Sequence, residues 1–126
     1  MNESLQKILL VAAGAALGAV ARYLISSAFP ADKCFLPWGT LIVNIVGGFA
    51  IGFIMGLAPQ FKLSSLVQTF LTTGMLGGLT TFSTFSNETI SLYENGAYLV
   101  ASVNMVANVV GALVACWIGH LAARIV

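Results

Sequence analysis

Four long apolar segments make up almost the whole chain, and each is about as long as a lipid bilayer is thick. They cover residues 5–29, 38–58, 63–94 and 97–124, and about 20 apolar residues are enough for one membrane-spanning helix. The apolar runs are continuous and lack the alternation of apolar and polar residues that is typical of a membrane β-barrel. The sequence therefore predicts an all-α integral membrane protein with four transmembrane helices in a single domain, residues 1–126.

Charged side chains are too scarce for a water-soluble protein. Only 7% of the residues are Asp, Glu, Lys or Arg, against about 25% in soluble domains. The formal net charge of +1 offers no basis for binding DNA or RNA. The two cysteines and the one histidine lack the spacing of a metal site, and no catalytic motif is present. We therefore expect membrane lipid as the surroundings, and neither an enzyme nor a nucleic-acid-binding protein.

The third apolar segment contains residues that disfavour a continuous helix. Gly77 and Gly78 are followed closely by the β-branched Thr80 and Thr81, and both residue types lower helix propensity. The threonine hydroxyls also compete for backbone hydrogen bonds. We predict a helix break near Gly77 to Thr81. A break at membrane depth is tolerated where protein or water covers it, and such breaks often present backbone carbonyls to ions.

The sequence also bears on how the helices pack and orient. Lys and Arg are almost balanced between the two sides of the membrane, so the positive-inside rule gives little bias. A four-span protein of this kind can insert in both orientations, and we expect an antiparallel, dual-topology homodimer. Small residues recur four positions apart, a spacing that lets helices approach closely in lipid; they are Gly14 and Gly18, then Gly48, Gly52 and Gly56, then Gly111, Ala115 and Gly119.

Asn44, in the first half of the second segment, is a polar residue at membrane depth. Thr40 lies one helical turn before it, on the same face. The Asn44 amide offers two hydrogens and an acceptor oxygen. It either donates a hydrogen bond to an anion or joins two helices, which is a common role of single buried amides. The residue pattern favours neither role over the other.

Residues 80–86 combine five hydroxyl groups with two phenylalanines. Phe82 and Phe85 are three residues apart and share a helix face, which is usual for a pair in a packed core. In an ion pathway they would have a second use, because the edge of an aromatic ring is positively polarised. Ring edges, with the neighbouring hydroxyls of Ser83 and Thr84, would partly replace the water that an anion loses without trapping it.

Three further polar positions extend this pattern. Glu88 follows Phe85 on the same stripe and is expected at a watery vestibule or at the end of the membrane. Asn104 and Asn108 lie one turn apart on the fourth segment. Arg22, near the end of the first segment, either extends to the lipid headgroups or attracts anions.

The residues around the predicted break resemble the signature of a known family. Residues 77–86, GGLTTFSTFS, are similar to the signature of the Fluc (CrcB) fluoride channels, and residues 38–44, WGTLIVN, are similar to the second-helix motif of that family. The chain length, the four-span plan and Arg22 late in the first helix agree with it. The resemblance implies a dual-topology dimer with two antiparallel pores in the inner or plasma membrane of a microbe. Such a channel lets fluoride leave the cytoplasm passively.

The resemblance also implies roles for individual residues. Backbone carbonyls of Gly77 and Thr80 from both subunits would hold a structural sodium ion at the dimer centre. Ala112 departs from the family pattern, because many members carry a hydroxyl there, so the polar track along the fourth segment would depend on Asn108 and Asn104. The pore residues that the resemblance implies are Phe82, Phe85, Asn44, Ser83, Thr84, Thr40 and Asn108, and the vestibule residues are Arg22 and Glu88.

Two other interpretations explain parts of the sequence. A small dual-topology multidrug or cation exporter has a similar size, but it needs a buried acid in its first span, and residues 5–29 contain none; Glu88 is the acid that would have to serve. A structural subunit of a larger membrane complex would explain the glycine spacing but not the cluster at residues 80–86. Within the channel interpretation, two paired, non-identical subunits are an alternative to the homodimer.

Overall fold

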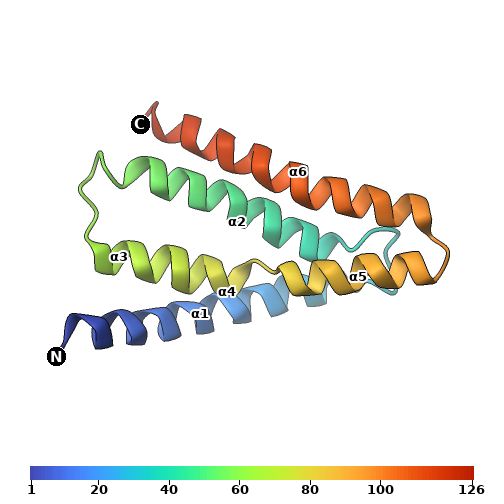
Figure 1. Cartoon of the computed structure of the whole chain (residues 1–126), viewed down its shortest axis with the longest axis horizontal. Coiled ribbons are helices and arrows are strands. Elements are labelled where there is room, and N and C mark those ends of the chain that lie inside the picture. Colours follow the sequence, from blue (N-terminus) through green and yellow to red (C-terminus); the bar gives the residue numbers. More distant parts are fainter.

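The structure consists of helices joined by short loops. The computed structural model describes all 126 residues and contains no strand, so the all-α expectation is confirmed. Four rods run back and forth along the long axis (Figure 1), and the third is assembled end to end from several pieces. In chain order the elements are α1 (Glu3–Ala28), α2 (Trp38–Leu57), α3 (Ser65–Thr69), the π-helix η1 (Phe70–Leu76), α4 (Gly77–Leu79), α5 (Phe82–Glu94) and α6 (Tyr98–Ala123).

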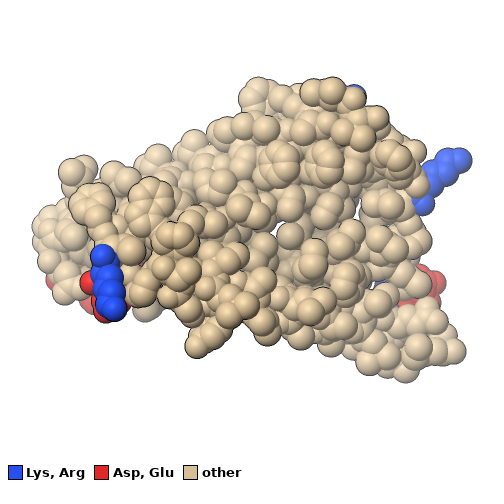
Figure 2. All heavy atoms as spheres, turned by 180° about the vertical axis from the view of Figure 1, so that it is seen from behind, with Lys and Arg blue, Asp and Glu red and all other residues tan.

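The long axis of the molecule separates apolar from charged surface. Helices α1, α2 and α6 are each long and apolar enough to cross a membrane. Both termini and the loop 58–64 lie at one end, and the loops 29–37 and 95–97 lie at the other (Figure 1). On the face shown in Figure 2, charged side chains gather toward these two ends, and the surface between them is uncharged. An apolar band between charged ends is the pattern of a protein that crosses a bilayer.

The third rod is interrupted at Thr80 and Thr81, within the range predicted for the break. Both residues have extended backbone angles, φ −79° and ψ 157° for Thr80 and φ −151° and ψ 121° for Thr81. The two glycines before them are helical and belong to α4, so the break falls on the β-branched threonines. No sequence feature predicts the π-helix η1, in which the N–H of Gly77 donates to the carbonyl of Thr72. π-Helical turns are rare and frequently occur at functional sites.

Close contacts at glycines divide the rods into two pairs. α2 lies against α6, and a Cβ at Gly48 would come within 2.7 Å of the carbonyl oxygen of Ala112. α1 lies against η1 and α4, and a Cβ at Gly14 would come within 2.6 Å of the carbonyl oxygen of Phe70. Backbones this close leave no room for a side chain, which is the packing that the spacing of small residues predicts. α5 packs against α6 and so joins the two pairs beside the break.

Candidate functional site

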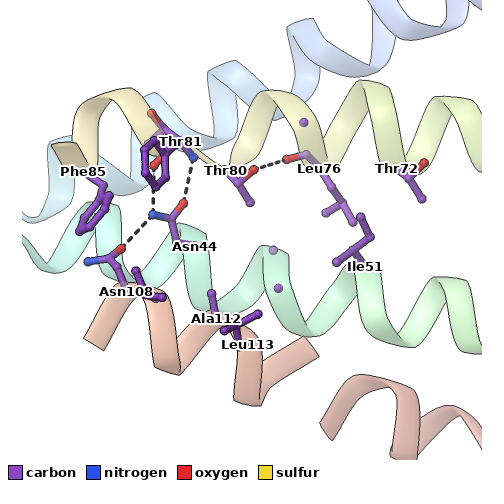
Figure 3. A pocket seen from close by; sticks show the side chains of 15 residues that line it. Asn44, Ile51, Thr72, Leu76, Thr80, Thr81, Phe85, Asn108, Ala112 and Leu113 are labelled. Atoms are coloured by element: carbon purple, nitrogen blue, oxygen red, sulfur yellow. Dashed lines mark hydrogen bonds between the residues drawn. The ribbon is translucent and has the colours of Figure 1, made fainter. Parts of the chain in front are cut away.

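A cavity lies between the two helix pairs, next to the break. It has a volume of about 450 Å³ and is lined by 15 residues of α2, η1, α4, α5, α6 and the break itself. Figure 3 shows Asn44 between Thr81 and Asn108, with Phe85 nearby. The two asparagines are the only lining residues whose side chains carry N–H donors, and no lining residue is charged. The polar character of the cavity therefore comes from neutral groups, without a fixed charge.

Asn44 of α2 is hydrogen-bonded to both backbone groups of Thr81. Its Oδ1 accepts from the N–H of Thr81 at 2.9 Å, and its Nδ2 donates to the carbonyl of Thr81 at 3.1 Å. The same Nδ2 donates to Oδ1 of Asn108 at 2.8 Å. Both amide hydrogens are thus used within the chain, and the side chain replaces helical hydrogen bonds that the break removes. The sequence allows Asn44 either to donate to an anion or to join two helices. These contacts show the second role, because Asn44 joins α2 to the break and to α6.

Thr81 also caps the helix that follows it. Its Oγ1 accepts from the backbone N–H of Thr84 at 3.2 Å and donates to Oγ1 of Thr84 at 3.1 Å. A threonine in this position satisfies one of the free N–H groups at a helix start. Because the 13-residue α5 begins here, the partial positive charge of its N-terminus lies at the break, beside the cavity.

The break also frees two backbone carbonyls. In a continuous helix, the carbonyl of Gly77 would accept from the N–H of Thr81, and the carbonyl of Thr80 would accept from the N–H of Thr84. Both N–H groups donate to side-chain oxygens instead, of Asn44 and of Thr81 respectively. Hard cations prefer oxygen ligands, and unwound carbonyls coordinate sodium in other broken membrane helices. The carbonyls of Gly77 and Thr80 therefore fit a sodium ion, although one chain supplies only part of a ligand shell.

Phe82 and Phe85 form an edge-to-face pair at the start of α5. Their ring centroids are 5.4 Å apart and the ring planes are inclined by 61°. Phe85 is 6% exposed, whereas Phe82 is 76% exposed. The pair thus extends from the interior of the chain to its outer surface, and the two rings share a helix face as expected.

Glu88 lies one turn beyond this pair and contacts α2. Its Oε1 accepts a hydrogen bond from Oγ1 of Thr40 at 2.9 Å. Its other carboxylate oxygen, Oε2, is buried and has no hydrogen-bond partner. The hydrogen bond between Glu88 and Thr40 links α5 to the first turn of α2, toward the end of the molecule that carries the loop 29–37.

The cavity brings together some of the residues that the sequence singled out, and leaves others apart. Arg22 is half-buried and forms no ion pair. The one ion pair of the chain joins Lys7 to Glu3 at 2.7 Å. The members that line the cavity are Asn44, Gly77, Thr80, Phe82, Phe85 and Asn108, and those that do not are Arg22, Thr40, Ser83, Thr84 and Glu88.

The sequence does not identify Thr81 and Thr89 as residues of the site. Thr81 anchors Asn44 and caps α5, and the signal for it was present, since a threonine between extended backbone and a helix is a typical N-cap. Thr89 is buried and accepts a hydrogen bond from Nδ2 of Asn104 at 2.9 Å. No local pattern marks it, because its partner lies 15 residues away on another helix.

Comparison with known proteins agrees with this architecture over nearly the full length. The family described as "CrcB-like protein, Camphor Resistance (CrcB)" matches residues 9–120. The fluoride-specific ion channel FluC of Pyrococcus abyssi (strain GE5 / Orsay) is 47% identical over 122 residues, 96% of this chain and 98% of the relative. Proteins with the same name from Geobacter sulfurreducens (strain ATCC 51573 / DSM 12127 / PCA) and Clostridium novyi (strain NT) are 48% identical over 120 residues and 47% identical over 128 residues. These matches cover 93% of this chain and 96% of the Geobacter protein, and 98% of each chain for the Clostridium protein.

The match explains the apolar helices together with the motif at the break. With three helices long enough to cross a bilayer, the molecule is a multi-pass protein of the plasma membrane. The family match covers far more than half of the sequence, and the matched residues 9–120 include the break and most of both helix pairs. The chain therefore belongs to the CrcB family.

Proposed function

We propose that this chain forms a passive, fluoride-selective channel through which fluoride leaves the cytoplasm. The observation that carries the proposal is the uncharged cavity at the break, where amide donors and aromatic ring edges lie together. The relatives are named fluoride-specific ion channels, which supports the choice of ion. Conduction requires binding that is favourable and yet weak, and neutral donors meet both conditions better than a lysine or an arginine would.

The contacts of Asn44 indicate how such weak binding arises. A fluoride ion that approaches its amide would displace the oxygen of Asn108 from one hydrogen of Nδ2, a contact of 2.8 Å. The Asn44 hydrogen then exchanges one acceptor for another while the buried oxygen of Asn108 loses its donor, so the net gain is small. The ring edges of Phe82 and Phe85, which line the cavity, would support the ion beside this position, and the hydroxyls of Ser83 and Thr84, outside the cavity, would border the path further along. The ion would be passed on and not held.

The proposed channel is an antiparallel homodimer with two pores. Two observations support a second copy, namely the exposure of Phe82 and the lining of the cavity by α2, α6 and the third rod without a helix on its open side. The near balance of Lys and Arg between the two ends supports opposite orientations. Thr40, Glu88 and Arg22 would then lie in the vestibules through which fluoride reaches each pore.

A structural sodium ion at the centre of the dimer is part of the same proposal. The carbonyls of Gly77 and Thr80 would hold it, because the helical donors of both are diverted to side chains. Two carbonyls from each of two chains would complete a small oxygen cage. The ion would neutralise the carbonyl dipoles and join the two breaks, and it takes no part in fluoride passage.

Fluoride efflux from liposomes tests the proposed function. Purified chain is reconstituted alone, and fluoride and chloride release are followed with ion-selective electrodes. Rapid fluoride release without chloride release is expected, and protein-free liposomes are the control. Retention of fluoride by liposomes that contain folded, dimeric protein would contradict the proposal.

A further inference from the structure

A continuous series of hydrogen bonds starts at Thr81, directly before α5, and ends on α5 at the carbonyl of Phe85. It passes through α2 and α6 on the way, and we call its four side chains, Asn44, Asn108, Asn104 and Thr89, the amide circuit. The links are Thr81 N–H to Asn44 Oδ1 at 2.9 Å, Asn44 Nδ2 to Asn108 Oδ1 at 2.8 Å, Asn108 Nδ2 to Asn104 Oδ1 at 3.1 Å, Asn104 Nδ2 to Thr89 Oγ1 at 2.9 Å, and Thr89 Oγ1 to the carbonyl of Phe85 at 2.8 Å.

The two ends of the circuit fix its direction. It begins at a backbone N–H, of Thr81, which can only donate, and it ends at a backbone carbonyl, of Phe85, which can only accept. Every amide between them must therefore accept on one side and donate on the other. If the amide of Asn108 were flipped, its nitrogen would face the nitrogen of Asn44 and its oxygen would face the oxygen of Asn104. Two backbone carbonyls favour the same orientations, because that of Thr81 accepts from Asn44 Nδ2 at 3.1 Å and that of Asn104 accepts from Asn108 Nδ2 at 3.0 Å. The fixed ends of the circuit and these backbone contacts therefore act together.

Burial raises the free-energy cost of losing any one hydrogen bond of the circuit. Asn104 is 0% exposed, and Asn108 and Thr89 are also buried. Water cannot replace a missing partner at such positions, so an unpaired amide would keep its full desolvation penalty. Aligned hydrogen bonds of this kind also polarise one another. A break anywhere in the circuit would therefore be felt at the other positions.

We infer that Asn104 and Thr89 are positioning residues, which act through Asn108 and add to the hold of Thr81 in keeping the N–H edge of the Asn44 amide, and not its oxygen, toward the ion path. Neither of them lines the cavity, whereas Asn44 and Asn108 do. The inference rests on the proposed function, because the choice of edge matters for an anion. A flipped Asn44 would present a carbonyl oxygen, which repels fluoride, and it would also lose the N–H of Thr81 as a donor.

Substitutions at Thr89 test the circuit at its most remote member. Thr89→Val keeps the shape of the side chain and removes the hydroxyl, while Thr89→Ala and Thr89→Ser form a second pair that differs only in the hydroxyl. Ser102→Ala is the matched control, because the Ser102 hydroxyl also donates to the carbonyl four residues before it, that of Tyr98, but is exposed and outside the circuit.

Two measurements are made on each variant, one of which does not depend on transport. Hydrogen exchange at the backbone amide of Thr81, followed by NMR in micelles, reports whether Asn44 still holds the break. We expect Thr89→Val and Thr89→Ala to speed this exchange by roughly tenfold, as the loss of one hydrogen bond implies. Fluoride efflux from liposomes should fall by a similar factor, and Thr89→Ser should behave as the wild type.

The outcomes separate the circuit from the proposed function. Exchange and efflux within about twofold of the Ser102→Ala control in both hydroxyl-free variants would overturn the inference, and so would a failure of Thr89→Ser to restore them. If Thr89→Val does not yield folded protein, the Ala and Ser pair supplies the same comparison. Wild-type protein that releases no fluoride, together with Thr81 exchange that responds to Thr89, would contradict the channel and leave the role of the circuit in holding Asn44 supported.

Discussion

Phe82 and Phe85 form one aromatic pair but have different surroundings. The ring of Phe85 is buried among the helices, whereas the ring of Phe82 faces outward from a single chain. Removing the Phe85 ring therefore affects both the fold and the proposed pore. Removing the Phe82 ring affects the proposed pore and the surface that a second copy would cover.

Replacement of either ring by isoleucine tests the role of the ring edges. We expect Phe82→Ile to lower fluoride efflux by about tenfold or more with little change in stability. Phe85→Ile should lower efflux and also reduce the free energy of unfolding by about 1–3 kcal/mol, because the branched side chain fits the buried site poorly. Efflux assays and thermal unfolding measure these effects, with Phe61→Ile in the exposed loop 58–64 as the control. Unchanged efflux in both variants would rule out the ring-edge mechanism.

Asn44→Asp separates the donors of this side chain from its shape. The carboxylate still accepts from the N–H of Thr81, but it has no hydrogen for the carbonyl of Thr81 or for Asn108. We expect fluoride efflux to be lost, because a fixed negative charge repels the anion, and thermal stability to fall as well. Asn87→Asp, at an exposed position on α5, is the control. Efflux at the wild-type rate would show that the Asn44 amide is not needed.

Glu88→Gln distinguishes a passive channel from a proton-coupled exporter. The amide oxygen of glutamine can still accept from Thr40, so the contact between α5 and α2 is kept. A passive channel needs no proton carrier, and we expect efflux to stay within about threefold of the wild type. Glu94→Gln, exposed at the end of α5, is the control. Complete loss of transport in Glu88→Gln alone would favour the exporter.

At the scale of helices, the sequence predicts the rods and the break but not the contacts that stabilise the break. Long apolar runs give the three unbroken helices, and two glycines with two threonines predict an interruption within a few residues of its place. The pairing of Asn44 with Thr81 joins residues 37 positions apart, and no local pattern encodes such a contact. The π-helix depends on tertiary packing in the same way, because it forms where the rod meets α1 at Gly14 and Gly74.

Gly47 of α2 holds the break at its observed distance from that helix. A Cβ at this position would overlap with the methyl group Cγ2 of Thr80, whose hydroxyl is held by the carbonyl of Leu76 at 3.0 Å. We expect Gly47→Ala to lower both stability and efflux, because Thr80 must move. Thr80→Ser removes the methyl group and keeps the hydroxyl, so the double variant should recover most of the loss in thermal unfolding and efflux. No recovery would mean that this contact is not the cause.

At the scale of the whole molecule, two closely packed helix pairs enclose a cavity whose outer side has no covering helix. Much of the outer surface is apolar, as lipid and a second copy both require. The charges at the two ends are few and nearly balanced. In the proposed dimer, each chain would provide the carbonyls of Gly77 and Thr80, which are half of the central cation site.

Removal of sodium should weaken the dimer if Gly77 and Thr80 contribute their carbonyls to a shared ion. We expect dimers in detergent micelles to dissociate at higher protein concentration when sodium is replaced by N-methylglucamine at equal ionic strength. Re-addition of sodium should restore the dimer. The same dissociation in both buffers would contradict the central cation site. Chemical crosslinking across a dilution series gives the fraction of dimer.

The amide circuit has a consequence for the order in which the protein is made. Its members come from α2, α5 and α6, and a ribosome makes α6 last. While α5 leaves the ribosome, Asn44 and Thr89 have no partners on α6, and their polar groups are costly in lipid. We therefore expect the third rod to complete its side-chain hydrogen bonds only after the C-terminal helix has been inserted. A chain that is cut short before α6 would expose the polar groups of Asn44 and Thr89 that face α6, and we expect membrane proteases to remove it faster than the full-length protein.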